Sequence, residues 1–116
     1  MAKVKKSAEI SPKDVHMPGT QGVSIRRLIS QQDGAANFAM RLFQVQPGGH
    51  TPRHRHAHEH EVYVLGGKGS ISGTGGEMPL ETGSAVLVLP QEEHQFRNSG
   101  CEPLVFLCVV PIGADV

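Results

Sequence analysis

The sequence predicts an all-β domain, a sandwich or small barrel built from about eight to ten short strands. Three observations favour this class. The 116 residues include 14 glycines and 8 prolines but no tryptophan, a composition rich in turn residues. From Val23 onward, short apolar stretches alternate with those turn residues. Apolar residues nowhere recur at helical spacing over three turns, so we expect no long helix.

The length predicts a single domain. A chain of 116 residues can bury one self-sufficient core but is too short for two. Residues 1–20 are polar and include Pro12, Pro18 and Gly19. We therefore expect an N-terminal tail, with one short edge strand near Ile10, followed by one β domain over residues 21–116.

The expected strands are apolar runs that stop at turn residues. The run from Val23 to Ile29 stops before a turn at residues 31–34, and the run from Phe38 to Gln46 stops at Pro47-Gly48-Gly49. A tight turn at residues 57–59 is expected to join two further strands into a hairpin. The remaining strands are expected at residues 54–56, 60–65, 70–72, 84–89, 94–97 and 103–110.

Charge and cysteine usage exclude several classes of partner. Lys and Arg total 11, as do Asp and Glu, so no basic excess is present to neutralise a nucleic acid. The longest apolar run, residues 104–110, is far below the roughly 18 residues of a membrane span. Residues 1–10 contain no secretory signal, and two cysteines are too few for a disulfide framework. We therefore expect a cytoplasmic protein with free thiols and neither a nucleic acid nor a membrane partner.

Histidine is the most informative residue type. Five of the 7 histidines fall between His50 and His60. His54 and His56 are two residues apart, so on a strand their side chains share a face. His60 follows across the expected turn, and His94 lies on a later strand. Because imidazole is the commonest metal ligand, His54, His56, His60 and His94 are candidate ligands. A structural zinc site or a pH-sensitive surface patch are the alternatives, and His58 is expected to point to solvent.

The spacing of these histidines resembles the first cupin motif. That motif combines an early glycine, a His-x-His pair, a further ligand and a closing glycine. The matching residues are Gly48, His54, His56, His60 and Gly67. Most cupins have glutamate at the third ligand position, where this chain has His60. Strand alternation then turns Glu61 outward.

The second cupin motif is similar to residues 83–98, from Gly83 through His94 to Asn98. It departs from the usual pattern at two turn positions, where Leu89 replaces a proline and Gln91 replaces a glycine. Neither position is a ligand position.

The chain most closely resembles small single-domain cupins with a four-histidine manganese site. The likeness covers roughly residues 8–113 and is clearest at residues 37–43, 59–65, 94–98 and 106–108. It implies a double-stranded β-helix, or jelly-roll, barrel and a homodimer built partly by exchanged terminal strands. It also implies one divalent ion per chain on the four histidines, with Mn²⁺ first, Fe²⁺ next, and Zn²⁺, Ni²⁺ or Cu²⁺ as further candidates. The resemblance places Phe96, Phe106 and Cys108 beside the metal, where they would line a substrate pocket.

A neutral set of four imidazoles would leave the full 2+ charge on the ion and two positions open. Together with these open positions, the cupin resemblance implies a metal-dependent oxidoreductase that uses oxygen or peroxide on a small organic substrate. The alternatives are a non-redox isomerase or lyase, with the metal as Lewis acid, and a non-catalytic module that binds a small molecule or a metal. Arg41 is expected to be a solvent-facing charge rather than a carboxylate anchor.

Overall fold

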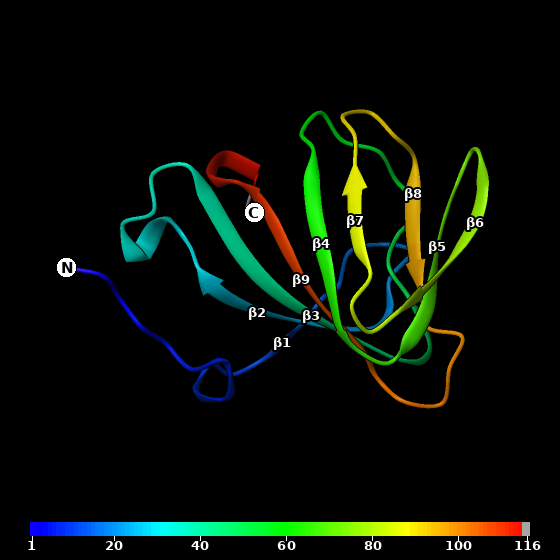
Figure 1. Ribbon diagram of the computed structural model, residues 1–116, viewed down its shortest axis with the longest axis horizontal. Helices are drawn as coiled ribbons and strands as arrows, with labels where there is room; N and C mark the ends of the chain where they lie inside the picture. The colour runs from blue at the N-terminus through cyan, green and yellow to red at the C-terminus, as the bar shows by residue number, and fades with distance from the viewer. Residues whose placement is uncertain (115–116) are drawn as a thin grey trace.

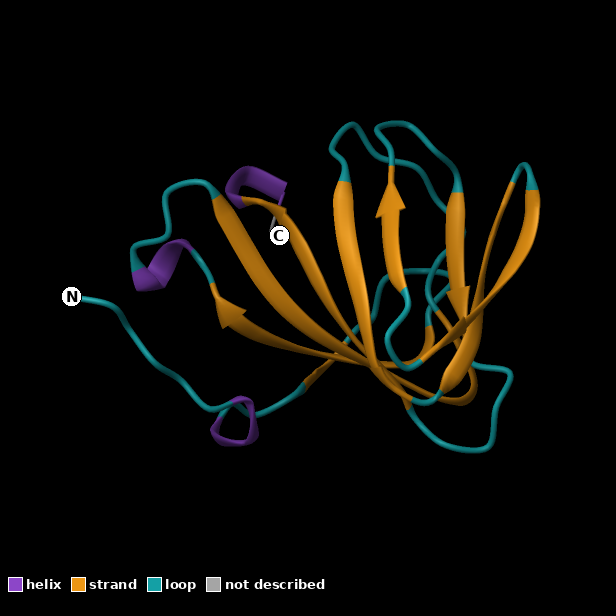
Figure 2. Ribbon diagram, viewed as in Figure 1, coloured by secondary structure: helices purple, strands orange, loops and turns teal. Residues whose placement is uncertain are grey.

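Nine β-strands and three short 3₁₀ helices make up the described part of this computed structural model, residues 1–114 (Figures 1 and 2). This composition confirms the all-β prediction. Within these residues, no helix has the length and apolar character needed to cross a membrane. The strands are β1 (Lys13–Asp14), β2 (Gln21–Ile29), β3 (Phe38–His50), β4 (His60–Gly66), β5 (Lys68–Gly73), β6 (Gly76–Glu81), β7 (Ala85–Val88), β8 (His94–Arg97) and β9 (Leu104–Pro111); the 3₁₀ helices are η1 (Ser7–Glu9), η2 (Gln31–Asp33) and η3 (Ile112–Ala114).

The strands form one antiparallel sheet that curls around a central cavity (Figure 1). The order is β6-β5-β8-β3-β9-β4-β7, and β2 also pairs with β3 and carries β1 on its other side. The long strand β3 therefore contacts β2, β8 and β9. This curl brings the start of β4 and the start of β8 to the same end of the cavity.

Side-chain alternation on β9 shows how the inner face is built. Leu104, Phe106, Cys108 and Val110 are buried, while the residues between them are half-buried on the outer face. The register places Phe43 of β3 opposite Phe106. Because side chains alternate between faces, each such pair forms part of a row that crosses the sheet on its inner side.

Two glycines allow the strands to approach closely at the end of the cavity away from the histidines. Gly67 has a positive φ of 83°, and a Cβ atom there would overlap the carbonyl oxygen of Pro103. A Cβ atom on Gly69 would overlap the carbonyl oxygen of Arg97. Gly67 is the residue that closes the first motif, so the motif glycine is required by packing rather than by chemistry.

The residue that ends the second motif, Asn98, has a structural role. Its side chain is 3% exposed and donates to the carbonyl oxygens of Val45 at 2.8 Å and Glu102 at 2.7 Å. Its own Oδ1 accepts from the backbone N–H of Gly100 at 2.9 Å. Asn98 therefore ties the loop between β8 and β9 to β3.

The prediction misplaces the end of β3 and misses the strand β6. β3 does not stop at Pro47 but continues to His50, because a register shift opposite Gly22 absorbs the extra residues as a bulge. The strand β6 was not predicted, since its glycines and Pro79 are typical of turns. It pairs only with β5 at the edge of the sheet, where a proline removes no needed hydrogen bond.

The predicted hairpin of residues 54–56 and 60–65 is also wrong. Residues 51–59 are irregular apart from a bridge between His54 and His94. β4 pairs instead with β7 and β9. The local apolar pattern could not reveal these partners, because both lie far along the chain.

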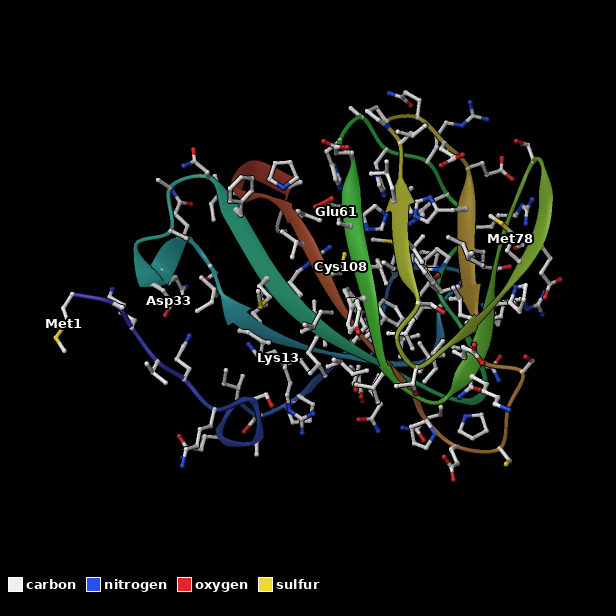
Figure 3. All side chains as sticks on the ribbon, in the orientation of Figure 1. Met1, Lys13, Asp33, Glu61, Met78 and Cys108 are labelled. Atoms are coloured by element: carbon white, nitrogen blue, oxygen red, sulfur yellow. The ribbon has the colours of Figure 1, made fainter. Side chains whose placement is uncertain are left out.

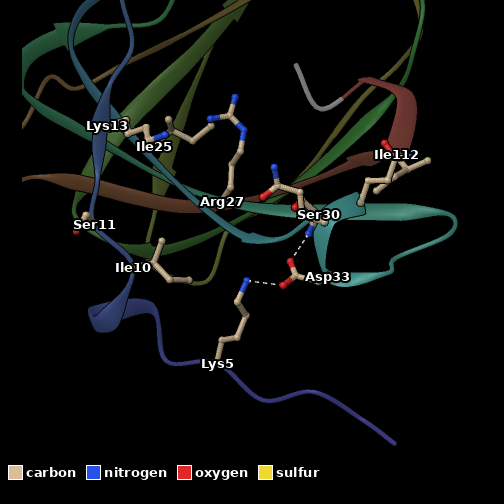
Figure 4. A pocket seen from close by; sticks show the side chains of 11 residues that line it. Lys5, Ile10, Ser11, Lys13, Ile25, Arg27, Ser30, Asp33 and Ile112 are labelled. Carbon is tan, nitrogen blue, oxygen red and sulfur yellow. Dashed lines mark hydrogen bonds and ion pairs between the residues drawn. The ribbon is translucent and has the colours of Figure 1, made fainter.

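The N-terminal tail contains a strand, but not at Ile10. β1 lies at Lys13–Asp14 and pairs with β2 of the same chain. Earlier in the tail, Lys5 donates to Asp33 at 2.8 Å (Figure 4). Lys5 also donates to the carbonyl oxygen of Leu28 at 2.9 Å. These contacts lie across a cavity of about 450 Å³ between the tail and β2.

Candidate metal centre

Four histidines converge at one end of the curled sheet. His60 begins β4 and His94 begins β8, so regular strands hold both. His54 exchanges two backbone hydrogen bonds with His94, at 3.1 and 3.0 Å, which fixes the irregular segment against β8. The carbonyl oxygen of His56 accepts from the N–H of Gln91 at 2.7 Å. Gln91 has a positive φ of 64°, in keeping with the glycine usual at this motif position.

The imidazole nitrogens are close enough to share one ion. The candidate ligand atoms of His54, His56 and His94 all lie within 4.8 Å of one another. The ring centroids of His56 and His94 are 4.9 Å apart, and those of His60 and His94 are 5.0 Å apart. The Nε2 atoms of His60 and His94 are 3.2 Å apart. Three histidines are therefore positioned to hold a metal ion, and His60 lies directly beside them.

Hydrogen bonds on the outer side of the rings fix the tautomers. Nδ1 of His56 donates to the carbonyl oxygen of His58, and Nδ1 of His94 donates to that of Glu92, both at 2.9 Å. A carbonyl oxygen can only accept, so both Nδ1 atoms carry the proton and both Nε2 atoms keep a lone pair. Outward Nδ1–H donation of this kind is typical of metal-binding histidines.

His60 has a different outer partner. Its Nδ1 lies 3.0 Å from Sγ of Cys108, which lies on β9 (Figure 3). The Nε2 atoms of His60 and His94 lie 3.2 Å apart, a separation at which the two nitrogens either share a proton or bind one cation together. This donor set therefore fits a divalent metal ion.

Burial favours the neutral form of His54, His60 and His94, the form that metal binding requires. Burial, together with the neighbouring His94, lowers the pKa of His54 to about 4. Burial, with His94 and His56 nearby, lowers the pKa of His60 to about 3. Burial also lowers the pKa of His94.

The histidines open into a cavity of about 430 Å³, here called the histidine cavity. This volume suits a small organic ligand. Phe96, Phe106 and Cys108 line it together with Phe43. The ring of Phe106 stacks on Phe96 at 4.8 Å and on Phe43 at 5.5 Å. A slab of three aromatic rings therefore forms an apolar wall beside the histidines.

Two residues expected to face solvent line the histidine cavity instead. His58 is half-buried and stacks on His56, with centroids 4.0 Å apart and ring planes 3° from parallel. Arg41 is half-buried, with its guanidinium 5.1 Å from the centre of the Phe43 ring. Strand alternation accounts for Arg41, because Ala39, Arg41 and Phe43 share the inner face.

The outward direction predicted for Glu61 is confirmed, since His60 is buried and Glu61 is exposed on β4. The lining residues that the sequence analysis missed include Phe43 on β3 and Arg27 on β2. Strand alternation could have indicated both residues. Every second residue from Val23 to Arg27 faces inward, and Phe43 lies two residues after Arg41 on the same face of β3. Neither strand contains a ligand motif that would have drawn attention to them.

Known proteins share this architecture. The sequence pattern of the cupin domain matches residues 41–110. An oxalate-binding protein of Thermotoga maritima is 32% identical over 113 residues, which cover 92% of each chain. A 1-methylthio-D-xylulose 5-phosphate methylsulfurylase of Rhodospirillum rubrum is 32% identical over 92 residues, which cover 79% of this chain and 59% of that protein.

A solved structure gives the same result. The polyketide cyclase RemF of Streptomyces resistomycificus superimposes with a TM-score of 0.91 at 32% identity, over 97% of this chain and 80% of that one. Such a match extends the likeness from the motif region to nearly the whole fold. The chain therefore belongs to the cupin domain family, as the spacing of its histidines and glycines predicts.

Proposed function

We propose that this cupin is a divalent-metal-dependent enzyme acting on a small, planar organic anion. The observation that carries the proposal is the convergence of the histidine side chains beside the aromatic wall of the histidine cavity. A divalent ion on neutral imidazoles keeps its full charge and, when bound, polarises a substrate oxygen and stabilises an enolate-like state. The residues of the chain would position the substrate, shape the cavity and exclude solvent.

His54, His56, His60 and His94 are the proposed ligands. The first two lie on an irregular segment, while the other two begin regular strands, so the strands would set the geometry and the segment would complete it. Imidazole donors suit iron, nickel, copper and zinc as well as the manganese that the resemblance implies. We propose Mn²⁺ or Fe²⁺ as the resident ion.

The aromatic wall would orient the substrate. Phe96 and Phe106 are 3% and 2% exposed, so neither ring can turn aside without opening a void in the core. A planar substrate that stacks against this wall would lose its own translational and rotational freedom, but the wall itself would lose little, because its rings are already fixed. Cys108 lies at the edge of this wall and contacts His60, which would orient that ligand.

A non-redox reaction, such as an isomerisation, elimination or ring closure, agrees best with the relatives. RemF, which matches 97% of this chain, is a polyketide cyclase. The oxidoreductase that uses oxygen or peroxide remains a second candidate, supported by imidazole donors that accommodate redox-active iron. A purely binding role is the third candidate, supported by the full-length likeness to an oxalate-binding protein.

Elemental analysis of the natively purified protein, beside a His56→Ala variant, is the first test. We expect about one metal ion per chain, lost in the variant and retained in a His16→Ala control, because His16 lies in the exposed tail. A metal-free wild-type protein, or a variant that keeps its metal, would contradict the proposal.

A substrate screen then separates the three candidates. Turnover that survives strict anaerobiosis and replacement of the ion by zinc indicates Lewis-acid chemistry. Turnover that stops under both conditions indicates an oxidoreductase. Ligand binding by the loaded protein without turnover of any bound compound indicates the binding role.

We also propose a homodimer that binds through the outer face of the sheet. Tyr63 and Leu87 are exposed there by 49% and 53%, on the neighbouring strands β4 and β7. Light scattering at micromolar concentration should give twice the mass of one chain, and a monomer mass would contradict this proposal.

A further inference from the structure

The irregular segment at residues 51–59 carries two of the four proposed ligands and is held against β8. It lies beside the loop between β7 and β8, at the upper end of the sheet in Figure 1. At its start, the N–H of Thr51 donates to the carbonyl oxygen of Phe96, and Oγ1 of Thr51 accepts from the N–H of Phe96, both at 2.9 Å. The bridge between His54 and His94 follows. These backbone contacts fix one side of the segment.

Side-chain alternation across this bridge separates the ligands from a group of charges. His54 and His94 line the histidine cavity. Because side chains alternate between the two faces, the neighbouring residues Arg53, Arg55 and Glu93 lie on the outer side. Charged side chains of both signs therefore lie directly behind the candidate ligands.

Glu93 interacts with both arginines. Nε of Arg53 donates to its Oε1 at 2.5 Å, and Nη2 of Arg55 lies 3.7 Å from its Oε2. Nη1 of Arg53 also donates to Oγ of Ser72, on β5, at 3.2 Å. The Glu93 side chain is 27% exposed, so water screens these charges only in part. These four side chains, here called the Glu93 network, connect the irregular segment with β5 and with the residue that precedes β8.

Packing fixes the backbone of Glu93. Gly73, at the end of β5, is opposed by His94 in the strand register. A Cβ atom on Gly73 would lie 2.6 Å from the carbonyl oxygen of Glu93, so only glycine lets β5 approach this residue so closely. Glu93 is therefore the fixed member of the network, and the two arginines attach the irregular segment to it.

We infer that Glu93 is a positioning residue, which holds the irregular segment against β8 through Arg53 and Arg55. His54 and His56 flank Arg55 in the chain, so their imidazoles move with the segment. The affinity of the site for a metal ion then depends on ionic strength, because salt screens ion pairs that are partly exposed. The effect on metal affinity rests on the proposed function, but the attachment of the segment does not.

Amide hydrogen exchange of the metal-free protein tests the attachment directly. The N–H of His54 donates to the carbonyl oxygen of His94 at 3.1 Å and exchanges when the segment detaches. We expect Glu93→Gln and Arg53→Gln each to accelerate this exchange about three- to tenfold, the range for one or two partly exposed ion pairs. A wild-type exchange rate in both variants would overturn the inference.

Glu61→Gln is the matched control, because it removes the same charge from an exposed position beside His60. Its exchange rate at His54 should stay near that of wild type. An acceleration equal to that of Glu93→Gln would show that any lost carboxylate loosens the segment, and would also overturn the inference.

Salt dependence is a readout that general destabilisation would not move. Raising the salt concentration from about 0.02 M to about 0.5 M shortens the Debye length from roughly 20 Å to roughly 4 Å. The exchange at His54 should therefore accelerate in wild type and change little in Glu93→Gln, which has already lost the ion pairs. Equal responses of the two proteins would contradict a role for the Glu93 network.

Titration with Mn²⁺ separates positioning from a simple effect of charge. Arg53→Gln removes a positive charge near a cation site, so charge alone would strengthen Mn²⁺ binding, whereas loss of positioning would weaken it. We expect Arg53→Gln and Glu93→Gln to bind Mn²⁺ about three- to tenfold more weakly than wild type. Tighter binding by Arg53→Gln would overturn the positioning role. If wild type binds no Mn²⁺, the proposed function fails, and the exchange rates alone decide this inference.

Discussion

The two ends of the inner face of the curled sheet are built in different ways. The closed end, formed by Val45, Leu104 and Phe106, consists of regular strand residues that are 0–2% exposed. The open end, formed by the four proposed ligands, draws two of them from the irregular segment at residues 51–59. Glycines permit close backbone contact at the closed end, while hydrogen bonds to Nδ1 orient the rings at the open end.

The two ends therefore have different roles: one stabilises the fold, and the other forms the proposed metal site. Apolar burial at the closed end stabilises the fold in proportion to the area removed from water. At the open end His60 and His94 are buried and His54 and His56 are half-buried, and these imidazoles contribute a binding geometry instead. Substitutions at the closed end should therefore change the free energy of unfolding, and substitutions at the open end should change metal affinity.

The largest expected effect is that of Phe106→Ala at the closed end. Loss of a fully buried ring stacked between Phe43 and Phe96 should lower the free energy of unfolding by about 3–5 kcal/mol. Denaturant titration measures it. Phe38→Ala is the control, since Phe38 is 67% exposed and should change stability by less than about 0.5 kcal/mol. Equal effects at the two positions would show that the closed end is not the stabilising core.

Gly69→Ala should follow. Its Cβ atom would overlap the carbonyl oxygen of Arg97 and lie 2.8 Å from Cδ2 of Leu104, so the strands must separate. We expect a loss of about 1–3 kcal/mol in the free energy of unfolding. Gly75→Ala, where a Cβ atom would meet nothing within 4 Å, should be nearly neutral. The melting temperatures of Gly69→Ala and Gly75→Ala test this prediction. Similar values would contradict the close approach of the strands at Gly69.

At the open end, Cys108→Ala should weaken metal binding by about 10–100-fold, because loss of a group that orients a ligand has this effect on metal sites. Cys108→Ser keeps an acceptor for Nδ1 of His60 and should restore part of the affinity. Competition with a chromophoric chelator measures both values. Cys101→Ala is the control, as Cys101 is exposed. Wild-type affinity in Cys108→Ala would remove His60 from the proposed ligand set.

The smallest effect is expected away from the cavity, at Asp33. Its hydrogen bond with Lys5 lowers the pKa of the carboxyl group below 3.8, so the folded state binds fewer protons than the unfolded state in this range. The resulting stabilisation is present above about pH 4 and is lost as the pH falls through the lowered pKa. Asp33→Asn should therefore be slightly less stable than wild type at pH 7, and the two melting temperatures should converge as the solution is acidified through the lowered pKa. A difference that grows on acidification would contradict this sign.

Much of this comparison was predictable from the sequence. The alternation of Phe106 and Cys108 on one face followed from strand periodicity, and the motif spacing selected His54, His56 and His94 as candidate ligands. The irregular course of residues 51–59 was not predictable in the same way. His-x-His on a strand and His-x-His in a bridged loop have the same sequence, and only contact with β8 distinguishes them.

Local pattern by itself determined the all-β class, the inner faces of β4 and β9 and the residue types of the metal centre, because alternation and ligand chemistry are encoded within a few neighbouring residues. Tertiary structure alone decided which strands pair, that Arg41 and His58 face the cavity, and that Arg27 opposes Arg41. Those outcomes depend on the curl and register of a sheet whose neighbouring strands lie far apart in the chain. No local pattern contains that information.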